Sequence, residues 1–131
     1  MNDVRRCAEN ELQRCADHFP VVTVLGPRQS GKTTLVKSYF KNYSYINLED
    51  PEFYDLAKND VNAFFSMIKG PVILDEVQRI PELLDKIQVT VDERKENAQF
   101  ILTGSFQQGL KSAISQSLAG RTAIINLLPF S

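Results

Sequence analysis

Residues 26–33 read GPRQSGKT and match the pattern G-x-x-x-x-G-K-[ST]. Glycines let a backbone wrap so that successive N–H groups point at a phosphate, and Lys32 can then reach the β- and γ-phosphates of a nucleotide. The Thr33 hydroxyl is of the type that ligates Mg²⁺, and Thr34 follows where a hydroxyl can reach an α-phosphate oxygen. The pattern predicts a phosphate-binding loop. Its candidate nucleotide-binding residues are Gly26, Pro27, Arg28, Gln29, Ser30, Gly31, Lys32, Thr33 and Thr34.

Two adjacent acids, Asp75 and Glu76, follow an apolar run at residues 72–74. An acid at the end of a buried strand can hold Mg²⁺ through its water shell, and the next acid can deprotonate a water that attacks the γ-phosphate. We therefore assign Asp75, with Thr33, to the metal and Glu76 to the catalytic base. A loop with two solvated acids is the alternative. The N-K-x-D motif expected of GTPases is absent from the sequence, which favours ATP.

Two further residues are candidates for a catalytic role beside Lys32 and Glu76. Thr103 follows the apolar run 100–102, and its hydroxyl would lie near the γ-phosphate if that strand lies between the first and third strands. Arg121 directly precedes the last apolar run, where a guanidinium can serve as an arginine finger for a neighbouring subunit's nucleotide. A plain strand-ending turn and an exposed arginine are the respective alternatives.

The elements that must hold these residues follow from apolar periodicity, which alternates between short runs and helical spacing. We expect strands at residues 21–25, 43–48, 72–74, 100–102 and 122–128. We expect helices at residues 3–18, 31–40, 52–58 and 61–69, from Pro81 through Val91, and from Leu110 to Gly120. Strands that alternate with helices imply βαβ units, and therefore a parallel sheet with helices on both faces.

Length and composition fit a single globular domain: the chain has 131 residues, of which 43% are hydrophobic and 24% are charged. The net charge of −1 provides no field for a polyanion, so we expect no direct nucleic-acid binding. No run of about 18 apolar residues occurs, which predicts a cytoplasmic protein without a membrane segment. Cys7 and Cys15 would lie about 12 Å apart along one helix, so we expect reduced thiols that serve packing.

Five stretches, in this order and spacing, carry a resemblance to a known family: GPRQSGKTTL, YINLEDPE, PVILDEVQRIPELL, FILTGS and SLAGRTAIINLLPFS. Over residues 20–131 the chain resembles the N-terminal ATPase domain of a prokaryotic family of AAA+-type ATPases, in which a C-terminal domain of unknown function follows. The resemblance implies a P-loop, three-layer αβα fold with a five-stranded parallel sheet in the order 5-1-4-3-2. It also implies that Thr103 lies near the sensor-one position and Arg121 at a finger position, whereas Arg79 is a polar candidate without an assigned role.

The resemblance also sets the functional expectation. Family members continue past Ser131 into a lid-like region and a C-terminal domain, so we expect these residues to form the nucleotide-binding domain alone. The expected function is an ATP-binding module whose Mg²⁺-dependent hydrolysis to ADP and phosphate drives a conformational change. The alternatives are a nucleotide-dependent switch or scaffold with little turnover, a DNA- or mobile-element-associated ATPase, and a small-molecule phosphotransferase. Expected partners are ATP and ADP, an unidentified protein and, in a longer form, further copies of the chain.

Overall fold

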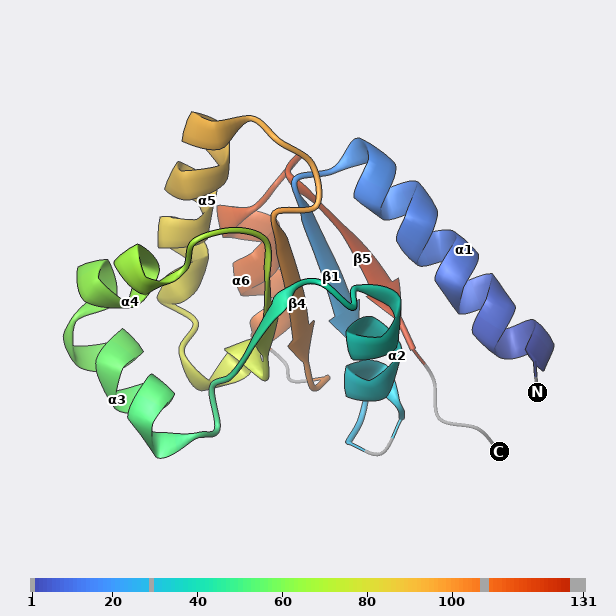
Figure 1. The fold of residues 1–131 in the computed structure, drawn as a ribbon, viewed down its shortest axis with the longest axis horizontal. Coiled ribbons are helices and arrows are strands. Elements are labelled where there is room, and N and C mark those ends of the chain that lie inside the picture. Colours follow the sequence, from blue (N-terminus) through green and yellow to red (C-terminus); the bar gives the residue numbers. More distant parts are fainter. Residues whose placement is uncertain (1, 29, 107–108, 128–131) are drawn as a thin grey trace.

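Helices and strands alternate along the chain in the computed structural model, which describes residues 2–28, 30–106 and 109–127, with side chains from residue 6 (Figure 1). The strands are β1 (Val21–Leu25), β2 (Ser44–Asn47), β3 (Val72–Asp75), β4 (Phe100–Gly104) and β5 (Thr122–Asn126). The helices are α1 (Asn2–His18), α2 (Lys32–Tyr39), α3 (Pro51–Asn59), α4 (Val61–Met67), α5 (Leu83–Arg94) and α6 (Leu110–Ser117), with a 3-10 turn η1 (Val77–Arg79).

The five strands form one sheet in the order β2-β3-β4-β1-β5, and every neighbouring pair is parallel. This result confirms the expected order 5-1-4-3-2. Because all strands run the same way, their carboxyl ends meet at one edge of the sheet. Ligands of open parallel sheets bind outside that edge, so the loops after β1, β3 and β4 are brought together there.

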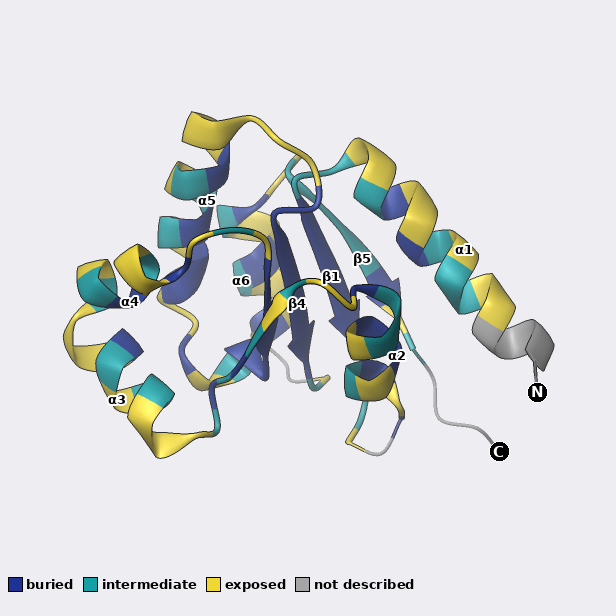
Figure 2. Cartoon of the chain, viewed as in Figure 1, coloured by how far each residue is buried: buried dark blue, intermediate teal, exposed yellow. Residues whose placement is uncertain are grey.

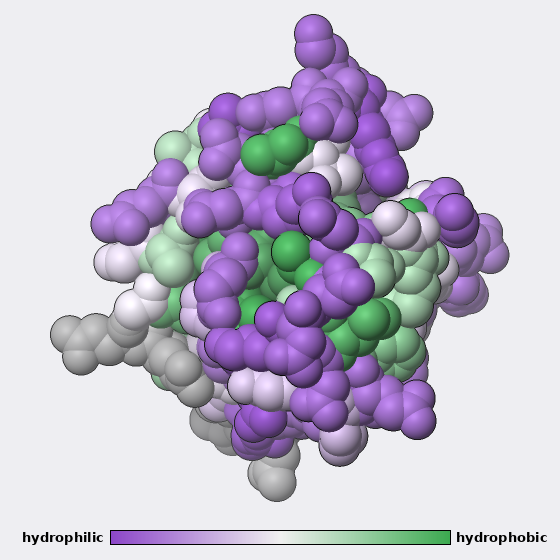
Figure 3. All heavy atoms as spheres, turned by 90° about the vertical axis from the view of Figure 1, so that its left-hand side faces the viewer, coloured by the Kyte–Doolittle hydropathy of each residue, from purple (hydrophilic) through white to green (hydrophobic). Residues whose placement is uncertain are grey.

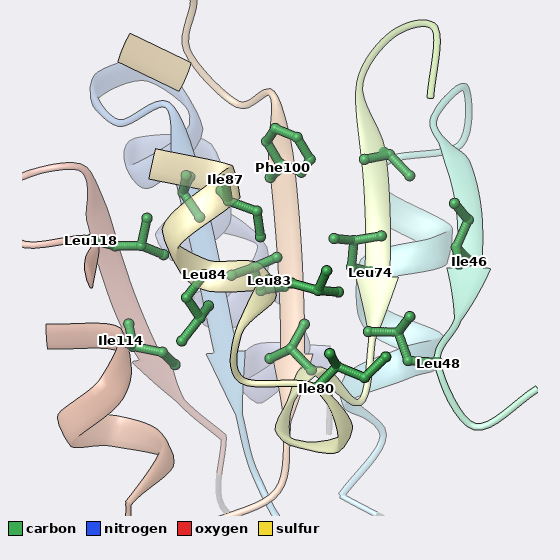
Figure 4. Packing of buried hydrophobic residues seen from close by; sticks show 14 of the residues in the cluster. Ile46, Leu48, Leu74, Ile80, Leu83, Leu84, Ile87, Phe100, Ile114 and Leu118 are labelled. Atoms are coloured by element: carbon green, nitrogen blue, oxygen red, sulfur yellow. The ribbon is translucent and has the colours of Figure 1, made fainter. Parts of the chain in front are cut away.

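Helices cover both faces of the sheet, which confirms the three-layer architecture (Figures 1 and 2). On one face, Leu12 and Cys15 of α1 and Val36 of α2 pack against β1, β3 and β4. On the other face, α3 to α6 pack against the alternate side chains of the same strands, as Figure 4 shows for Leu84 of α5 and Ile114 of α6. The central strands β1, β3 and β4 are therefore buried throughout, as continuous apolar runs predict.

The expected elements are present, with differences at their ends that bear on the site. β3 includes Asp75, and β4 includes Thr103 and Gly104, so the polar residues expected just after these strands lie within them. The 3-10 turn η1 was not expected from the sequence. β5 ends at Asn126, and the expected end of this strand, at Leu128, lies outside the described residues.

Between α3, α4 and α5 lies a hollow of about 480 Å³ whose apolar lining includes Ala57, Val61, Leu83 and Val89, among polar neighbours (Figure 3). The two cysteines are free: Cys15 is buried and Cys7 is exposed, so packing explains Cys15 alone. Among the described helices, none is long and apolar enough to cross a membrane.

The contribution of α4 to stability can be tested at Phe64, because this side chain is fully buried in the hydrophobic cluster between the sheet and α3 to α6. Phe64→Ala should lower the free energy of unfolding by about 3–5 kcal/mol, the cost of a large cavity in a packed core. Urea denaturation measures this loss. Ser66→Ala, at an exposed position of the same helix, should stay within about 0.5 kcal/mol of wild type. A comparable small loss for Phe64→Ala would show that α4 does not pack as described.

Candidate functional site

The loop between β1 and α2 requires glycine at both ends. Gly26 donates its N–H to the carbonyl oxygen of Gly104 at 3.0 Å, and a Cβ on Gly26 would lie 2.6 Å from the Leu127 carbonyl oxygen and 2.8 Å from Ser30 Oγ. Gly31 caps α2 with φ of 84°, a left-handed conformation that favours glycine. Gly26 therefore lets the chain pass close to the end of β5, and Gly31 lets it turn into α2.

A pocket of about 390 Å³ opens at the N-terminus of α2. Its lining consists of Arg28, Gly31, Lys32, Thr33, Thr34 and Glu76. Helix N-termini present free N–H groups and a positive dipole end, which together favour anions. A larger hollow of about 480 Å³ lies at the opposite edge of the sheet, beside residues that precede β2, β3 and β4, and it includes none of the predicted site residues.

Lys32 contributes a buried positive charge to this pocket. The residue is 3% exposed, and its Nζ lies 3.5 Å from the Pro27 carbonyl oxygen and 3.5 Å from Glu76 Oε2. Charge-assisted hydrogen bonds are normally 2.7–2.9 Å long, and an ammonium has three donors. Lys32 therefore keeps hydrogen-bonding capacity that a phosphate group can take up.

Asp75 is the most heavily bonded acid of the site. The residue is 4% exposed. Its carboxylate accepts hydrogen bonds from Thr33 Oγ1 at 3.1 and 3.2 Å, from the Tyr45 hydroxyl and from the Thr103 hydroxyl. Burial and then the bond to Asp75 raise the pKa of Tyr45, so this hydroxyl stays protonated at neutral pH. Three elements thus converge on one carboxylate at the end of β3.

The donor set at Asp75 and Thr33 fits a magnesium ion shared with nucleotide phosphates. Both residues offer oxygen, the ligand Mg²⁺ prefers, and Mg²⁺ usually takes one or two protein groups and keeps several waters. Among the described residues, no group of three or more His, Cys, Asp or Glu side chains is placed to hold a metal.

Glu76 leaves β3 in a left-handed conformation, with φ of 63°. Such a conformation in a non-glycine residue costs about 1–3 kcal/mol and occurs where the surroundings enforce it. Here the Glu76 N–H donates to Thr103 Oγ1 at 3.0 Å, while its carboxylate faces Lys32 on one side and Gln78 on the other. The turn aims the second acid into the pocket while the first acid stays in the sheet.

The remaining loop residues divide by position. Arg28 forms an exposed ion pair with Glu49, and this hydrogen bond raises the pKa of the guanidinium. The Ser30 hydroxyl is buried and has no hydrogen-bond partner among the described residues, so it is an open polar group within the loop. Thr34 is exposed and lines the pocket. Gln29 lies outside the described residues.

The structure does not bring the two other candidate arginines into the pocket. Arg121 forms a forked ion pair with Asp92 at 2.8 and 2.9 Å, which lowers the pKa of that carboxyl. Its carbonyl oxygen accepts from the N–H of Val21, the first residue of β1, so it lies at the opposite edge from the phosphate loop. Arg79 lies over the ring of Tyr54, 5.1 Å from the ring centre.

Sequence reasoning missed two contacts to the acids. Tyr45 reads as an ordinary aromatic residue of a strand, yet its hydroxyl reaches Asp75 across neighbouring strands. Gln78 lies in η1 and donates to Glu76 at 2.8 Å. No signal in the sequence indicates these contacts. The register that brings Asn47 beside Asp75, with Tyr45 two residues earlier on the same face, follows only from the pairing of β2 with β3 in the structure.

A parallel sheet in this order, a glycine loop that leads into a helix, and adjacent acids at the end of β3 define a P-loop ATPase of the α/β class. Residues 18–131 match a family model described as an AAA domain, and the chain belongs to this family. This result confirms the family resemblance for the ATPase domain.

The chain is similar to known proteins at two levels. An uncharacterized protein of Mycobacterium tuberculosis, Rv2008c, is 36% identical over 124 residues, which are 94% of this chain and 28% of that protein. The Walker-type ATPase PABY2304 of Pyrococcus abyssi has a similar structure, with a TM-score of 0.62 at 17% sequence identity. The superposed region is 97% of this chain and 54% of the chain of PABY2304. AMPPCP-bound DnaA from Aquifex aeolicus has a TM-score of 0.57 at 17% sequence identity, and the superposed region is 92% of this chain and 44% of the DnaA chain. The chain therefore spans less than a third of the length of its sequence relative.

Thr103 tests whether one hydroxyl joins the two acids, since it donates to Asp75 and accepts from the Glu76 N–H while fully buried. Thr103→Val keeps the shape and should lower the free energy of unfolding by about 1–3 kcal/mol, because it leaves two buried polar groups short of a partner. Urea denaturation measures the change. Thr23→Val is the matched control in β1: the partner of Thr23, Thr122, also bonds to a backbone oxygen, so this loss should be smaller. Equal losses would contradict the bridging role.

Proposed function

We propose that this domain binds Mg·ATP and Mg·ADP and hydrolyses ATP to ADP and phosphate in a Mg²⁺-dependent reaction coupled to a conformational change. The observation that carries the proposal is the convergence of the buried Lys32 ammonium, the Thr33 hydroxyl and the Glu76 carboxylate on one pocket at the N-terminus of α2, with Asp75 hydrogen-bonded to Thr33 directly behind it. The fold likeness to AMPPCP-bound DnaA and the family match support a nucleotide as the ligand.

Phosphate recognition rests on the loop and Lys32. The N–H groups at the start of α2 and the buried Lys32 ammonium offer hydrogen-bond donors and positive charge to a phosphate in the pocket. Two hydroxyls add further hydrogen-bonding groups: that of Ser30, which is buried within the loop, and that of Thr34, which is exposed. Arg28 adds charge at the pocket mouth while paired with Glu49.

The two acids have separate roles in this proposal. Thr33 and Asp75 would hold Mg²⁺, which supplies positive charge to the phosphate oxygens. Glu76 accepts a proton from a water that attacks the γ-phosphorus, and the bond from phosphorus to the β–γ bridging oxygen breaks, which yields ADP and phosphate. Thr103 contributes by holding both acids, through its bonds to the Asp75 carboxylate and the Glu76 N–H.

A second candidate is a nucleotide-dependent switch with little turnover in this domain alone. The observation that favours it is the position of Arg121, which lies at the opposite edge of the sheet and pairs with Asp92. A finger role for Arg121 then requires a second copy of the chain, as in assemblies where such a residue raises the rate by about 10³–10⁵. Under this second candidate, a longer form of the chain would bind a partner protein or further copies of itself.

Lys32→Ala should weaken binding of Mg·ADP at least tenfold, as expected when a charge-assisted contact of about 1.5–3 kcal/mol is removed. Titration calorimetry measures the affinity. Lys41→Ala removes an equal charge from an exposed turn just after α2 and should leave the affinity within about twofold. Equal affinities for Lys32→Ala and wild type would overturn the phosphate-loop assignment.

Glu76→Gln should retain nucleotide binding and lose hydrolysis, because the amide keeps the shape but accepts no proton. Asp75→Asn should instead reduce the gain in affinity that Mg²⁺ provides. Single-turnover release of γ-phosphate and calorimetry with and without Mg²⁺ separate the two effects. If wild-type hydrolysis is measurable and Glu76→Gln stays within about twofold of it, Glu76 is not the base.

A further inference from the structure

The carboxylate of Glu76 has unlike neighbours on its two oxygens. Gln78 Nε2 donates to Oε1 at 2.8 Å, and the Ser105 hydroxyl lies 3.5 Å from the same oxygen. On the other side, Lys32 Nζ is 3.5 Å from Oε2, which is longer than an ordinary charge-assisted bond of 2.7–2.9 Å. A neutral amide thus holds the buried carboxylate more closely than the buried cation beside it does.

Gln78 is itself fixed by the exit of β4. The Ser105 N–H donates to Gln78 Oε1 at 3.3 Å, which orients the carbonyl oxygen toward β4 and the amide nitrogen toward Glu76. Gly104 leaves room for this amide, because a Cβ there would lie 3.0 Å from Gln78 Oε1 and 2.7 Å from Leu110 Cδ2. The side chain therefore bridges two strand ends with its donor and acceptor assigned by their partners.

We propose that Gln78 is a positioning residue that holds the Glu76 carboxylate toward the exit of β4 and off Lys32. The Lys32 ammonium then remains available to the phosphates of a nucleoside di- or triphosphate, and the base stays in place when the nucleotide arrives. The inference rests on the proposed nucleotide site and deepens it: the fold restrains an internal anion that competes with the ligand for the same cation.

Electrostatics gives the reason such a restraint is needed. Lys32 and Glu76 are 3% and 6% exposed, and opposite charges in such surroundings attract more strongly than they do in water. Without the bond from Gln78, the carboxylate can move closer to Lys32 and tighten the ion pair that the two groups form at 3.5 Å. Phosphate binding would then have to break that pair, and the affinity for nucleotide would fall.

The test measures Mg·ADP affinity by titration calorimetry, so it does not depend on hydrolysis. Gln78→Met, which keeps the length of the side chain without its amide, and Gln78→Ala are each made in the wild type and in Glu76→Gln. Each should weaken binding by about three- to tenfold in the wild type and by less than about twofold in Glu76→Gln, because a neutral amide at position 76 does not compete for Lys32. Gln116→Ala, at an exposed position of α6, should change neither background.

Rescue by Glu76→Gln is the readout that a merely structural role would not move. Weakening of the same size in both backgrounds would overturn the inference, as would unchanged affinity of both Gln78 variants in the wild type. A wild-type chain that fails to bind Mg·ADP would overturn the proposed function and this inference with it. A chain that binds, with unaffected Gln78 variants, would overturn the inference alone. Circular dichroism of Gln78→Met confirms that the compared proteins are folded.

Discussion

Asp75 is 4% exposed, and the cost of burying its carboxylate must be offset by hydrogen bonds. These come from Thr33 of α2, Tyr45 of β2 and Thr103 of β4. These donors come from elements far apart in the sequence, so the carboxylate ties the phosphate loop to the sheet. Thr103 extends the tie to the backbone of Glu76. The phosphate loop and both acids therefore keep their relative positions because one buried charge has to be satisfied.

The parallel sheet makes this convergence possible. Since β4 lies between β1 and β3, the phosphate loop after β1 and the two acids at the end of β3 face each other across the end of β4. Gly104, at that end, accepts the N–H of Gly26 and leaves space for the amide of Gln78. The last residues of β4 thus contact both the phosphate loop, through Gly26, and the second acid, through the Glu76 N–H, so changes there should reach both.

Much of the fold was predictable, because buried parallel strands are continuous apolar runs and glycine marks the phosphate loop. The strand order came from the family resemblance, since no local pattern states which strands are neighbours. The contacts of Tyr45 and Gln78 were not predictable for the same reason: each joins residues whose proximity arises from pairing or from an unexpected 3-10 turn. Residue types identified the acids and the lysine, but only tertiary structure distinguishes the partners of their oxygens.

Arg121 lies too far from the phosphate loop to act within one chain. Its guanidinium joins the end of α5 to the start of β5 through Asp92, and both residues lie at the surface, where water and salt screen the pair. Because the phosphate loop lies at the other edge of the sheet, this guanidinium cannot serve the pocket of its own chain. Such a surface pair contributes little to stability, whereas the contacts of Asp75 are buried and costly to lose. The surface pair of Arg121 and the buried contacts of Asp75 thus lie at opposite edges of the sheet.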